Sequence, residues 1–479
     1  MGDRWSFRIS SPSYYASDTE PGVVNTRRQL ILSGKVAEEP RELSSLVDPM
    51  EITSALLKRS GPWSIVYHRP DLNRIFVARD VFGRLSLVFA PVNDDIIISD
   101  VVCSTSHLDW NEVPYAQVCS IDLRSRSAIC NTYLSAYPEN ILEPWKNMFR
   151  SFTLQCTPIK NDLLKISRST LYPEHTVLED FLERLVLAVQ TMISQDAKSI
   201  AVAYSGGVDS MLVAIALHKA YQSDRTIDLV NVAFLRGSEH RSIATDRQRA
   251  ISGLRYLRSK FADRKWRLIL VDVTREDLER NRSEYIARAA VPAVSVLDES
   301  LACVLWYGLR GIGKDFDSGE EIKSDAVIYF VGSGADELFG GYARHRTRFN
   351  ECGSVDSVVE ECEAELQRLG CRNGGRDARV AAMLKKELRA PFLDDSFVAW
   401  ANTLPMQMKC DLTLPRGVGE KLIVRQVLAH LGAPHNAPKQ AMQFGSGYVK
   451  LQEDKTLKGN DVSRHLATTE SLAHPRESQ

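Results

Sequence analysis

The second half of the chain constrains the fold most strongly, because short β-branched runs alternate there with helical stretches. Segments in which apolar residues recur with helical spacing separate four such runs, at 200–203, 227–234, 268–273 and 326–331. Strands that alternate with helices in this way lie parallel, since each crossover helix returns the chain to the same end of the sheet. The pattern therefore predicts an α/β fold in which helices cover both faces of a parallel sheet.

The preceding part of the chain has a different pattern, with strand-like runs punctuated by turn residues. Six runs predict a β-rich region, at 29–32, 63–68, 74–78, 86–90, 95–99 and 117–123. Thr176 and Glu179 have the spacing of a capping box at the start of the first helix of the α/β region. We therefore expect an irregular N-terminus at 1–28, a β-rich domain at 29–150, a linker at 151–175, an α/β domain at 176–454 and a polar tail at 455–479.

The composition and charge are those of an average globular protein. The 479 residues include 60 basic and 61 acidic side chains, which disfavours a nucleic-acid-binding protein. We find no apolar stretch long enough to span a bilayer, and the first residues lack the order of a secretory signal. The nine cysteines are odd in number and lack CxxC spacing, which is typical of reduced thiols rather than of a disulfide framework or a zinc site. We therefore expect a cytoplasmic protein.

The motif most specific for chemistry is Ser-Gly-Gly-Val-Asp-Ser, which lies between a predicted strand and a predicted helix. Gly206 and Gly207 let the backbone approach a phosphate closely, and the free N–H groups of the helix N-terminus point toward it. Ser205 and Ser210 can donate hydroxyl groups, whereas Asp209 needs a cation between itself and a phosphate and is assigned to Mg²⁺. The alternative is a glycine-rich turn that happens to contain serines. The spacing differs from that of a Walker-type loop, which disfavours a hydrolase of that class.

A second segment narrows the class of protein. The sequence VGSGADELFGGY at 331–342 follows a predicted strand and resembles the SGEGSDELFGGY segment of glutamine-dependent asparagine synthetases. Further stretches match that family: LDES at 297–300, RAPFLD at 389–394, LPRG at 414–417 with GEK at 419–421, PKQAMQFGS at 438–446, GPW at 61–63 and RDVFGRLSL at 79–87. The chain is thus similar to the asparagine synthetase family of the glutamine-hydrolysing type, and within it to the eukaryotic asparagine synthetase domain-containing proteins.

The resemblance implies a β-rich, glutaminase-like domain of the Ntn-hydrolase type, incomplete here, before a sheet of the ATP-pyrophosphatase type. It also implies a two-step reaction with ATP and Mg²⁺ as cofactors. An aspartate carboxylate attacks the α-phosphorus of ATP to give β-aspartyl-AMP and pyrophosphate. Ammonia, supplied free or from glutamine, then displaces AMP to form asparagine. The implied partners are these small-molecule substrates, with no nucleic acid and no membrane, and a homodimer is left open.

The family's roles transfer to individual positions of this sequence. The loop rich in serine and glycine would hold the departing pyrophosphate, and Asp209 and Asp336 would hold Mg²⁺. Ala233 and Gly332 lie at predicted strand ends and would line the adenosine pocket. Lys439 would stabilise charge during adenylation, with an ordinary surface lysine as the alternative.

Two departures from the family pattern bear on activity. Family members begin Met-Cys-Gly and use the exposed cysteine as the glutaminase nucleophile, whereas residue 2 here is Gly. The family's general base for ammonia attack is a glutamate of SGEGSDE, and Ser333 stands in its place. A serine hydroxyl cannot accept a proton near neutral pH without a base of its own. Glu337 is retained, either as a catalytic residue or as the residue that fixes the following glycine turn.

These departures predict loss of glutaminase activity and leave two hypotheses for the remaining chemistry. The first is an asparagine synthetase-like enzyme that adenylates aspartate and uses free ammonia. The second is a pseudoenzyme, an ATP-binding or interaction module that makes no asparagine. A tRNA-modifying ATP pyrophosphatase is disfavoured, because the sequence lacks the cysteine pairs of the sulfur-transferring type and a basic composition. Two further expectations concern residues outside these motifs. His345 is expected on a solvated helix face or, alternatively, in contact with a phosphate, and 315–325 is expected to be an exposed acidic loop.

Overall fold

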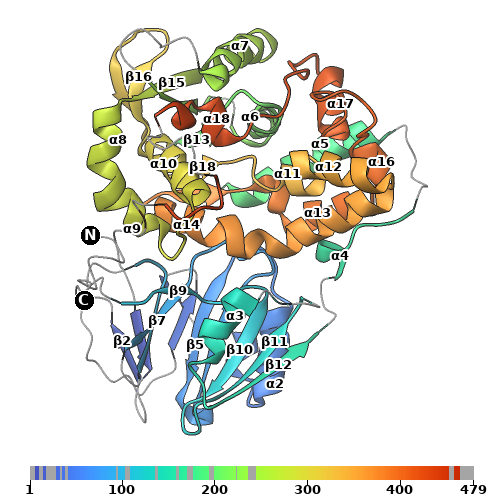
Figure 1. Cartoon of the computed structure of the whole chain (residues 1–479). Coiled ribbons are helices and arrows are strands. Elements are labelled where there is room, and N and C mark those ends of the chain that lie inside the picture. Colours follow the sequence, from blue (N-terminus) through green and yellow to red (C-terminus); the bar gives the residue numbers. More distant parts are fainter. Residues whose placement is uncertain are drawn as a thin grey trace, which may run out of the picture.

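The computed structural model describes residues 6–9, 14–17, 29–32, 35–37, 41–92, 95–102, 108–134, 137, 139–157, 161–169, 176–193, 199–222, 224–235, 244–451, 458–463 and 466. Within these residues the chain forms a β-rich N-terminal unit and an α/β C-terminal unit, drawn one below the other in Figure 1. None of the described helices has the length and apolarity that a membrane crossing requires.

The C-terminal unit is built, among the described residues, on a seven-stranded sheet with the order β17-β16-β15-β14-β13-β18-β19. Parallel pairing joins β13 (Ile200–Ala203), β14 (Ile227–Phe234), β15 (Trp266–Val273), β18 (Ile328–Phe330) and β19 (Glu387–Arg389). An antiparallel hairpin of β16 (Ile312–Asp315) and β17 (Glu321–Lys323) extends the edge beside β15. The prediction of an exposed loop at 315–325 is therefore wrong for 315 and 321–323, which backbone pairing brings into the sheet, whereas 316–320 form the turn between the two strands, of which 317–320 are exposed.

Helices cover both faces of this sheet, as the alternation of patterns predicts. Ile200 and Val202 of β13 belong to a hydrophobic core that includes α6 (Val208–Ala220). Ala201, between them, belongs to a second core that includes α10 (Val296–Arg310). Because successive strand residues point to opposite faces, the two cores lie on the two sides of the sheet. The α/β fold with a parallel sheet is confirmed.

The first helix of the C-terminal unit, α5 (Val177–Met192), begins where the sequence predicts, but without the expected capping box. The Thr176 hydroxyl makes no backbone cap and lies instead 3.3 Å from Asp180 Oδ2. The other helices of the unit are α7 (Thr245–Lys260), α8 (Arg275–Asn281), α9 (Ala287–Ala290), α11 (Ala335–Leu338), α12 (Ala343–Cys352), α13 (Val355–Leu369), α14 (Gly375–Met383), α15 (Asp395–Thr403), α16 (Met406–Lys409), α17 (Leu422–His430) and α18 (Met442–Gly445).

The N-terminal unit contains two sheets packed face to face. The described part of the smaller sheet has the order β2-β1-β8-β7-β9, with β1 (Ser6–Ile9), β2 (Tyr14–Ser17), β7 (Val88–Val92), β8 (Asp95–Ser99) and β9 (Asn111–Glu112). The larger has the order β12-β11-β10-β6-β5-β3-β4, with β3 (Gln29–Leu32), β4 (Lys35–Ala37), β5 (Ser64–Arg69), β6 (Arg74–Arg79), β10 (Gln117–Asp122), β11 (Ser127–Thr132) and β12 (Ser151–Cys156). Two strands, β1 and β2, thus occupy part of the stretch expected to be irregular.

A hydrophobic core between the two sheets holds the N-terminal unit together. It combines side chains of both sheets, such as Val77 of β6 and Phe89 of β7, both fully buried. The opposite face of the larger sheet packs on α2 (Pro49–Leu57), whose Ile52 and Leu56 are also fully buried. The remaining described helices of this half are α1 (Arg41–Ser44), α3 (Glu139–Lys146) and α4 (Asn161–Leu164).

Two cysteines of the larger sheet form a disulfide. Cys119 of β10 lies directly opposite Cys130 of β11, and their sulfurs are bonded. The expectation of reduced thiols is therefore wrong for this pair. The pairing depends on the strand register, which the cysteine spacing does not reveal.

A buried arginine joins the two units. Arg84 Nε pairs with Asp80 at 2.9 Å and Arg84 Nη2 donates to the Gly61 carbonyl at 2.6 Å, both in the N-terminal unit. Its Nη1 donates to the Leu393 carbonyl at 2.6 Å and pairs with Asp395 at 2.8 Å, both in the C-terminal unit. One guanidinium thus fixes the two units against each other, on the side where α13 and α14 face the sheets in Figure 1.

Candidate functional site

The site lies where the strand order of the parallel sheet reverses. From β13 the chain crosses through α6 to β14 on one side, whereas β18, which comes later in the sequence, pairs with the other side of β13. The loops that leave β13 and β18 at their carboxyl ends therefore begin side by side at this end of the sheet. Open α/β sheets bind their ligands at this point.

The loop after β13 has the geometry of an anion cradle. Gly206 has a φ of +71°, and a Cβ there would lie 2.3 Å from the backbone nitrogen of Ala250, so only glycine fits. Ser205 Oγ accepts a hydrogen bond from the Gly207 N–H at 3.2 Å and lies 3.3 Å from Ser210 Oγ. Because α6 begins directly after Gly207, the free N–H groups of its first turn lie beside these hydroxyls. This arrangement can hold a phosphate group.

The loop after β18 packs directly on the first loop. A Cβ at Gly332 would lie only 2.7 Å from the Cβ of Asp209, so the two backbones approach as closely as glycine allows. Asp336 lies in the first turn of α11, and its carbonyl accepts a hydrogen bond from the Gly341 N–H at 2.9 Å. The two acidic residues are thereby brought to the same end of the sheet.

Two lysines neutralise these carboxylates. Lys421 Nζ lies 2.9 and 2.6 Å from the two carboxylate oxygens of Asp209 and 2.8 Å from Asp336 Oδ1. Lys439 pairs with the other oxygen, Asp336 Oδ2. Lys421 is fully buried, whereas the Lys439 side chain is 28% exposed. The site therefore holds a buried and a solvent-facing ammonium around one pair of carboxylates.

These ion pairs shift the pKa values of Asp336 and Lys439. Burial alone would raise the pKa of Asp336, but the ammonium groups of Lys421 and Lys439 together hold that pKa well below its ordinary range. Burial alone would lower the pKa of Lys439, but the Asp336 and Asp209 carboxylates raise it above its ordinary value. Both Asp336 and Lys439 are therefore charged throughout the physiological pH range.

The two carboxylates fit Mg²⁺ as ligands. Oxygens of Asp209 and Asp336 lie within 3 Å of one cationic nitrogen, that of Lys421, so they already converge on a point that a cation occupies. Carboxylate oxygens from one or two residues are the protein ligands that Mg²⁺ ordinarily takes, together with phosphates and water. No group of three or more His, Cys, Asp or Glu side chains arranged for a metal occurs in the described part of the chain. The phosphates of a nucleotide would complete the coordination.

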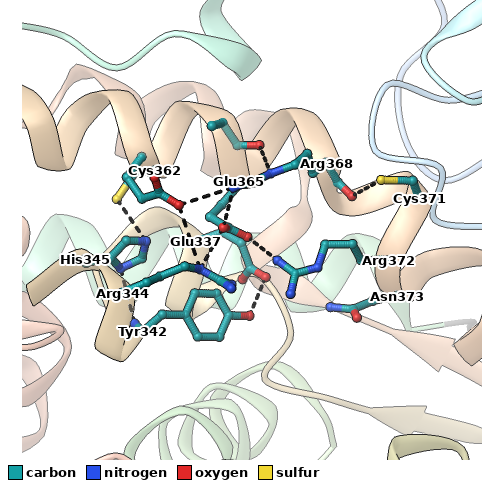
Figure 2. A network of polar contacts seen from close by, with 12 residues as sticks. Glu337, Tyr342, Arg344, His345, Cys362, Glu365, Arg368, Cys371, Arg372 and Asn373 are labelled. Carbon is teal, nitrogen blue, oxygen red and sulfur yellow. Dashed lines mark hydrogen bonds and ion pairs between the residues drawn. The ribbon is translucent and has the colours of Figure 1, made fainter. Parts of the chain in front are cut away.

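Glu337 fixes the turn that follows it. Its carboxylate accepts a hydrogen bond of 2.7 Å from the Tyr342 hydroxyl, as Figure 2 shows. Burial, and then the neighbouring Asp336 charge, raise the pKa of Glu337. The contact supports the interpretation of Glu337 as the residue that closes the glycine turn, and a catalytic role for it stays a prediction.

Behind this turn, a polar network ties α12 to α13. Buried Glu365 accepts charged contacts of 2.7 Å from Arg344, Arg368 and Arg372, which surround it in Figure 2. His345 is fully buried beside them and accepts a hydrogen bond of 3.2 Å from the Tyr342 N–H. Burial lowers the pKa of His345 to about 4, so the ring is neutral. Neither interpretation of His345 holds, because it lies neither on a solvated helix face nor at an accessible surface where a phosphate could bind.

The two residues predicted to line an adenosine pocket flank β13. Ala233 is the penultimate residue of β14 and is fully buried, and Gly332 follows β18. The Phe234 N–H donates to the Ser446 carbonyl at 2.8 Å, so the segment after Lys439 closes over the end of β14. The structure thus places both positions at the carboxyl end of the parallel sheet, and their contact with adenosine stays a prediction.

Ser333 lines a cavity between the two units. The cavity has a volume of about 70 Å³, and its wall combines Phe82 and Arg84 of the N-terminal unit with Ser333 and Asp377 of the C-terminal unit. The position at which the family carries a glutamate therefore faces the domain interface. The serine hydroxyl at position 333 cannot accept a proton there without a neighbouring base.

Comparison with known proteins identifies the family. The family model described as asparagine synthase matches residues 180–356. Asparagine synthetase domain-containing protein 1 of Mus musculus is 32% identical, over 88% of this chain and 84% of that protein. The chain belongs to the asparagine synthetase family. The human protein of the same description is 29% identical over 91% of this chain and 85% of its own length. The glutamine-hydrolyzing asparagine synthetase of Gallus gallus is 35% identical over 22% of this chain and 17% of its own length.

The sequence analysis missed the importance of two residues. Lys421 lies in the matched GEK stretch, but only the fold shows that it joins Asp209 to Asp336. Arg425 lies one turn further along α17, is 4% exposed, and donates to the carbonyls of His435 at 2.5 Å and Ala437 at 2.9 Å. It thereby holds the loop that carries Lys439. Its place in a matched motif was the available signal for Lys421, whereas Arg425 lies outside the matched stretches and had no such signal.

Proposed function

We propose that this asparagine synthetase-like chain binds ATP with Mg²⁺ at the point where the strand order of the parallel sheet reverses. There it adenylates aspartate and passes the acyl group to ammonia. The observation that carries the proposal is the convergence of Asp209, Asp336, Lys421 and Lys439 beside a glycine-rich anion cradle. This arrangement places alternating charges where a polyphosphate and a metal ion would meet. Membership of the family supports ATP as the nucleotide, aspartate as the acyl donor and ammonia as the acyl acceptor.

The first step is nucleophilic displacement at the α-phosphorus. A carboxylate oxygen of aspartate forms a bond to phosphorus, and the bond to the bridging oxygen breaks with release of pyrophosphate. The loop at 205–210 and the start of α6 bind the pyrophosphate, and Lys439 offsets negative charge on the α-phosphate. Mg²⁺, when bound by Asp209 and Asp336, supplies positive charge opposite the polyphosphate. Ala233 and Gly332 lie beside the adenosine.

The second step replaces AMP with nitrogen. Ammonia forms a C–N bond to the acyl carbon, the C–O bond to AMP breaks, and the nitrogen loses a proton. In this chain Ser333 cannot take that proton, so water or a second ammonia molecule must do so. Amidation is therefore the step that the sequence of this chain weakens.

A second candidate function follows from the same observation. Ser333 favours a pseudoenzyme that binds MgATP and makes no asparagine. We propose further that the two packed sheets of the N-terminal unit form a glutaminase-like domain and that the chain acts in the cytoplasm.

Exchange of labelled pyrophosphate into ATP tests adenylation directly. We expect exchange that depends on aspartate and Mg²⁺ and that Asp209→Ala abolishes, with Asp224→Ala, an exposed aspartate, as the matched control. Binding of MgATP without exchange on any carboxylate would establish the pseudoenzyme instead. The ratio of asparagine formed to AMP formed then tests amidation. We expect Ser333→Glu to raise that ratio at low ammonia concentration, and an unchanged ratio would show that the base at this position does not limit the reaction.

A further inference from the structure

We infer that Lys421 occupies the place of the divalent cation in the ligand-free protein, so that the metal enters only together with the polyphosphate. The inference rests on the proposed nucleotide site and goes beyond it, because it assigns an order of loading and a residue that enforces this order. It follows from the positions of four charged side chains.

Lys421 has the position that a shared metal ion would take. Its Nζ lies within 2.9 Å of three oxygens, two from Asp209 and one from Asp336, and its side chain is fully buried. The backbone holds it there: Lys421 has a φ of +52° immediately before α17, and its N–H donates to the Phe339 carbonyl at 3.1 Å. A lysine fixed at this depth has no solvent to move into when a metal ion approaches alone, so its ammonium needs another anion nearby before it can leave the carboxylates.

The charges at the site already balance without a metal. Asp209 and Asp336 carry two negative charges, and Lys421 and Lys439 carry two positive charges within ion-pair distance of them. A divalent cation added alone would leave two uncompensated positive charges in a largely buried site, which is strongly unfavourable. A polyphosphate brings the negative charge that both the metal and the lysines need. The ammonium groups can then pair with phosphate oxygens and release the carboxylates to the metal.

The composition of the site agrees with this order. A site that binds free Mg²⁺ or Ca²⁺ tightly gathers several carboxylates, whereas a site that loads a metal–nucleotide complex needs only one or two. The described residues offer no third His, Cys, Asp or Glu to this pair. Free metal therefore has neither the ligands nor the charge balance to bind.

Binding of Mn²⁺, used in place of Mg²⁺ and followed by its electron paramagnetic resonance signal, tests the inference without any need for turnover. We expect wild-type protein to take up Mn²⁺ only when α,β-methylene-ATP is present. We expect Lys421→Met to bind Mn²⁺ without nucleotide at least about tenfold more tightly than wild type, because an unbalanced carboxylate pair remains. Lys265→Met, which removes an exposed lysine, is the matched control and should behave as wild type.

Lys421→Gln repeats the comparison if Lys421→Met does not fold, since glutamine is neutral but can still donate to both carboxylates. The inference is overturned if wild type binds Mn²⁺ alone as tightly as with the nucleotide analogue, or if neither Lys421 variant gains affinity. Failure of the proposed function has a different signature, which is the absence of binding of the nucleotide analogue. The comparison of wild type with the Lys421 variants in Mn²⁺ alone then still decides the inference.

Discussion

Substitution of Gly332 by alanine tests whether the loops that follow β13 and β18 must touch. Gly332 does not have a positive φ, so alanine is compatible with its backbone, and the effect of the substitution is purely steric. The added Cβ would lie 2.7 Å from the Asp209 Cβ, whereas unstrained contacts of this kind begin near 3.4 Å. The two loops must therefore separate by about 0.7 Å, the difference between those two distances, which exceeds the freedom of a close-packed interior.

The size of the effect follows from this displacement. Overpacking of a well-packed interior by one methyl group costs about 1–3 kcal/mol of unfolding free energy. A shift of this size would also draw Asp209 away from Lys421, whose nitrogen lies 2.6 Å from the nearer carboxylate oxygen. We therefore expect Gly332→Ala to lower the melting temperature by several degrees and to weaken MgATP binding by about tenfold or more.

The assay is differential scanning calorimetry together with titration of Mg²⁺ and α,β-methylene-ATP. Gly308→Ala is a matched control, because Gly308 lies inside α10 and its added Cβ would make an ordinary contact of 3.4 Å with Val232. Alanine in a helix interior is favoured over glycine by up to about 1 kcal/mol, so this control should melt at the same or a higher temperature. Equal melting temperatures and equal nucleotide affinities for Gly332→Ala and wild type would refute the argument that the loops are in contact.

Three further predictions concern charged side chains. Burial raises the pKa of Asp246 to about 6 from 3.8, so ionisation of this carboxyl lowers the stability of the folded state by about 3 kcal/mol above pH 6 and not at all below pH 4. Asp246→Asn should therefore raise the melting temperature at pH 8 but not at pH 4. Arg84→Met removes the ion pair of 2.8 Å between Arg84 and the Asp395 carboxylate and should lower the free energy of unfolding in urea by about 3–5 kcal/mol, a loss that Arg84→Met combined with Asp395→Asn should reduce. Arg425→Met frees the loop that carries Lys439 and should speed chemical acylation of Lys439 several-fold, measured by mass spectrometry relative to an exposed lysine. An unchanged acylation rate would argue against a role of Arg425 in positioning this loop.

Local sequence patterns were sufficient where local interactions decide the structure. The strands at 200–203 and 227–234 have the predicted bounds, because a continuous apolar run flanked by turn residues leaves few alternatives. The glycine-rich loop was likewise recognisable, since its chemistry lies within six neighbouring residues. Composition misled at 315–325, where the acidic residues pointed to a loop and edge pairing formed a hairpin instead.

Contacts between residues that lie far apart in the chain could not be predicted from sequence patterns. Lys421 lies 212 positions after Asp209, and only the packing of α17 beside α6 brings the two together. The same limit applies to His345, which a basic stretch of sequence placed at the surface and the packing of α12 on α13 buries. Charge density along the chain reports exposure only when no partner helix covers the segment.

The site contains four charged residues and one position, 333, at which the family resemblance places a general base. Only the second of these parts departs from the family pattern in this chain. Asp209, Asp336, Lys421 and Lys439 form a complete and balanced set, and such a buried set is costly to maintain unless its members stay together. Ser333 lines the cavity at the domain interface, and its hydroxyl lacks the basicity of a general base. An acyl adenylate that is formed but not aminated is hydrolysed by water, so a chain that kept only the first step would consume ATP without a product. The ratio of asparagine to AMP is therefore the quantity that separates the two candidate functions: an enzyme keeps it near one, and a nucleotide-binding module forms neither.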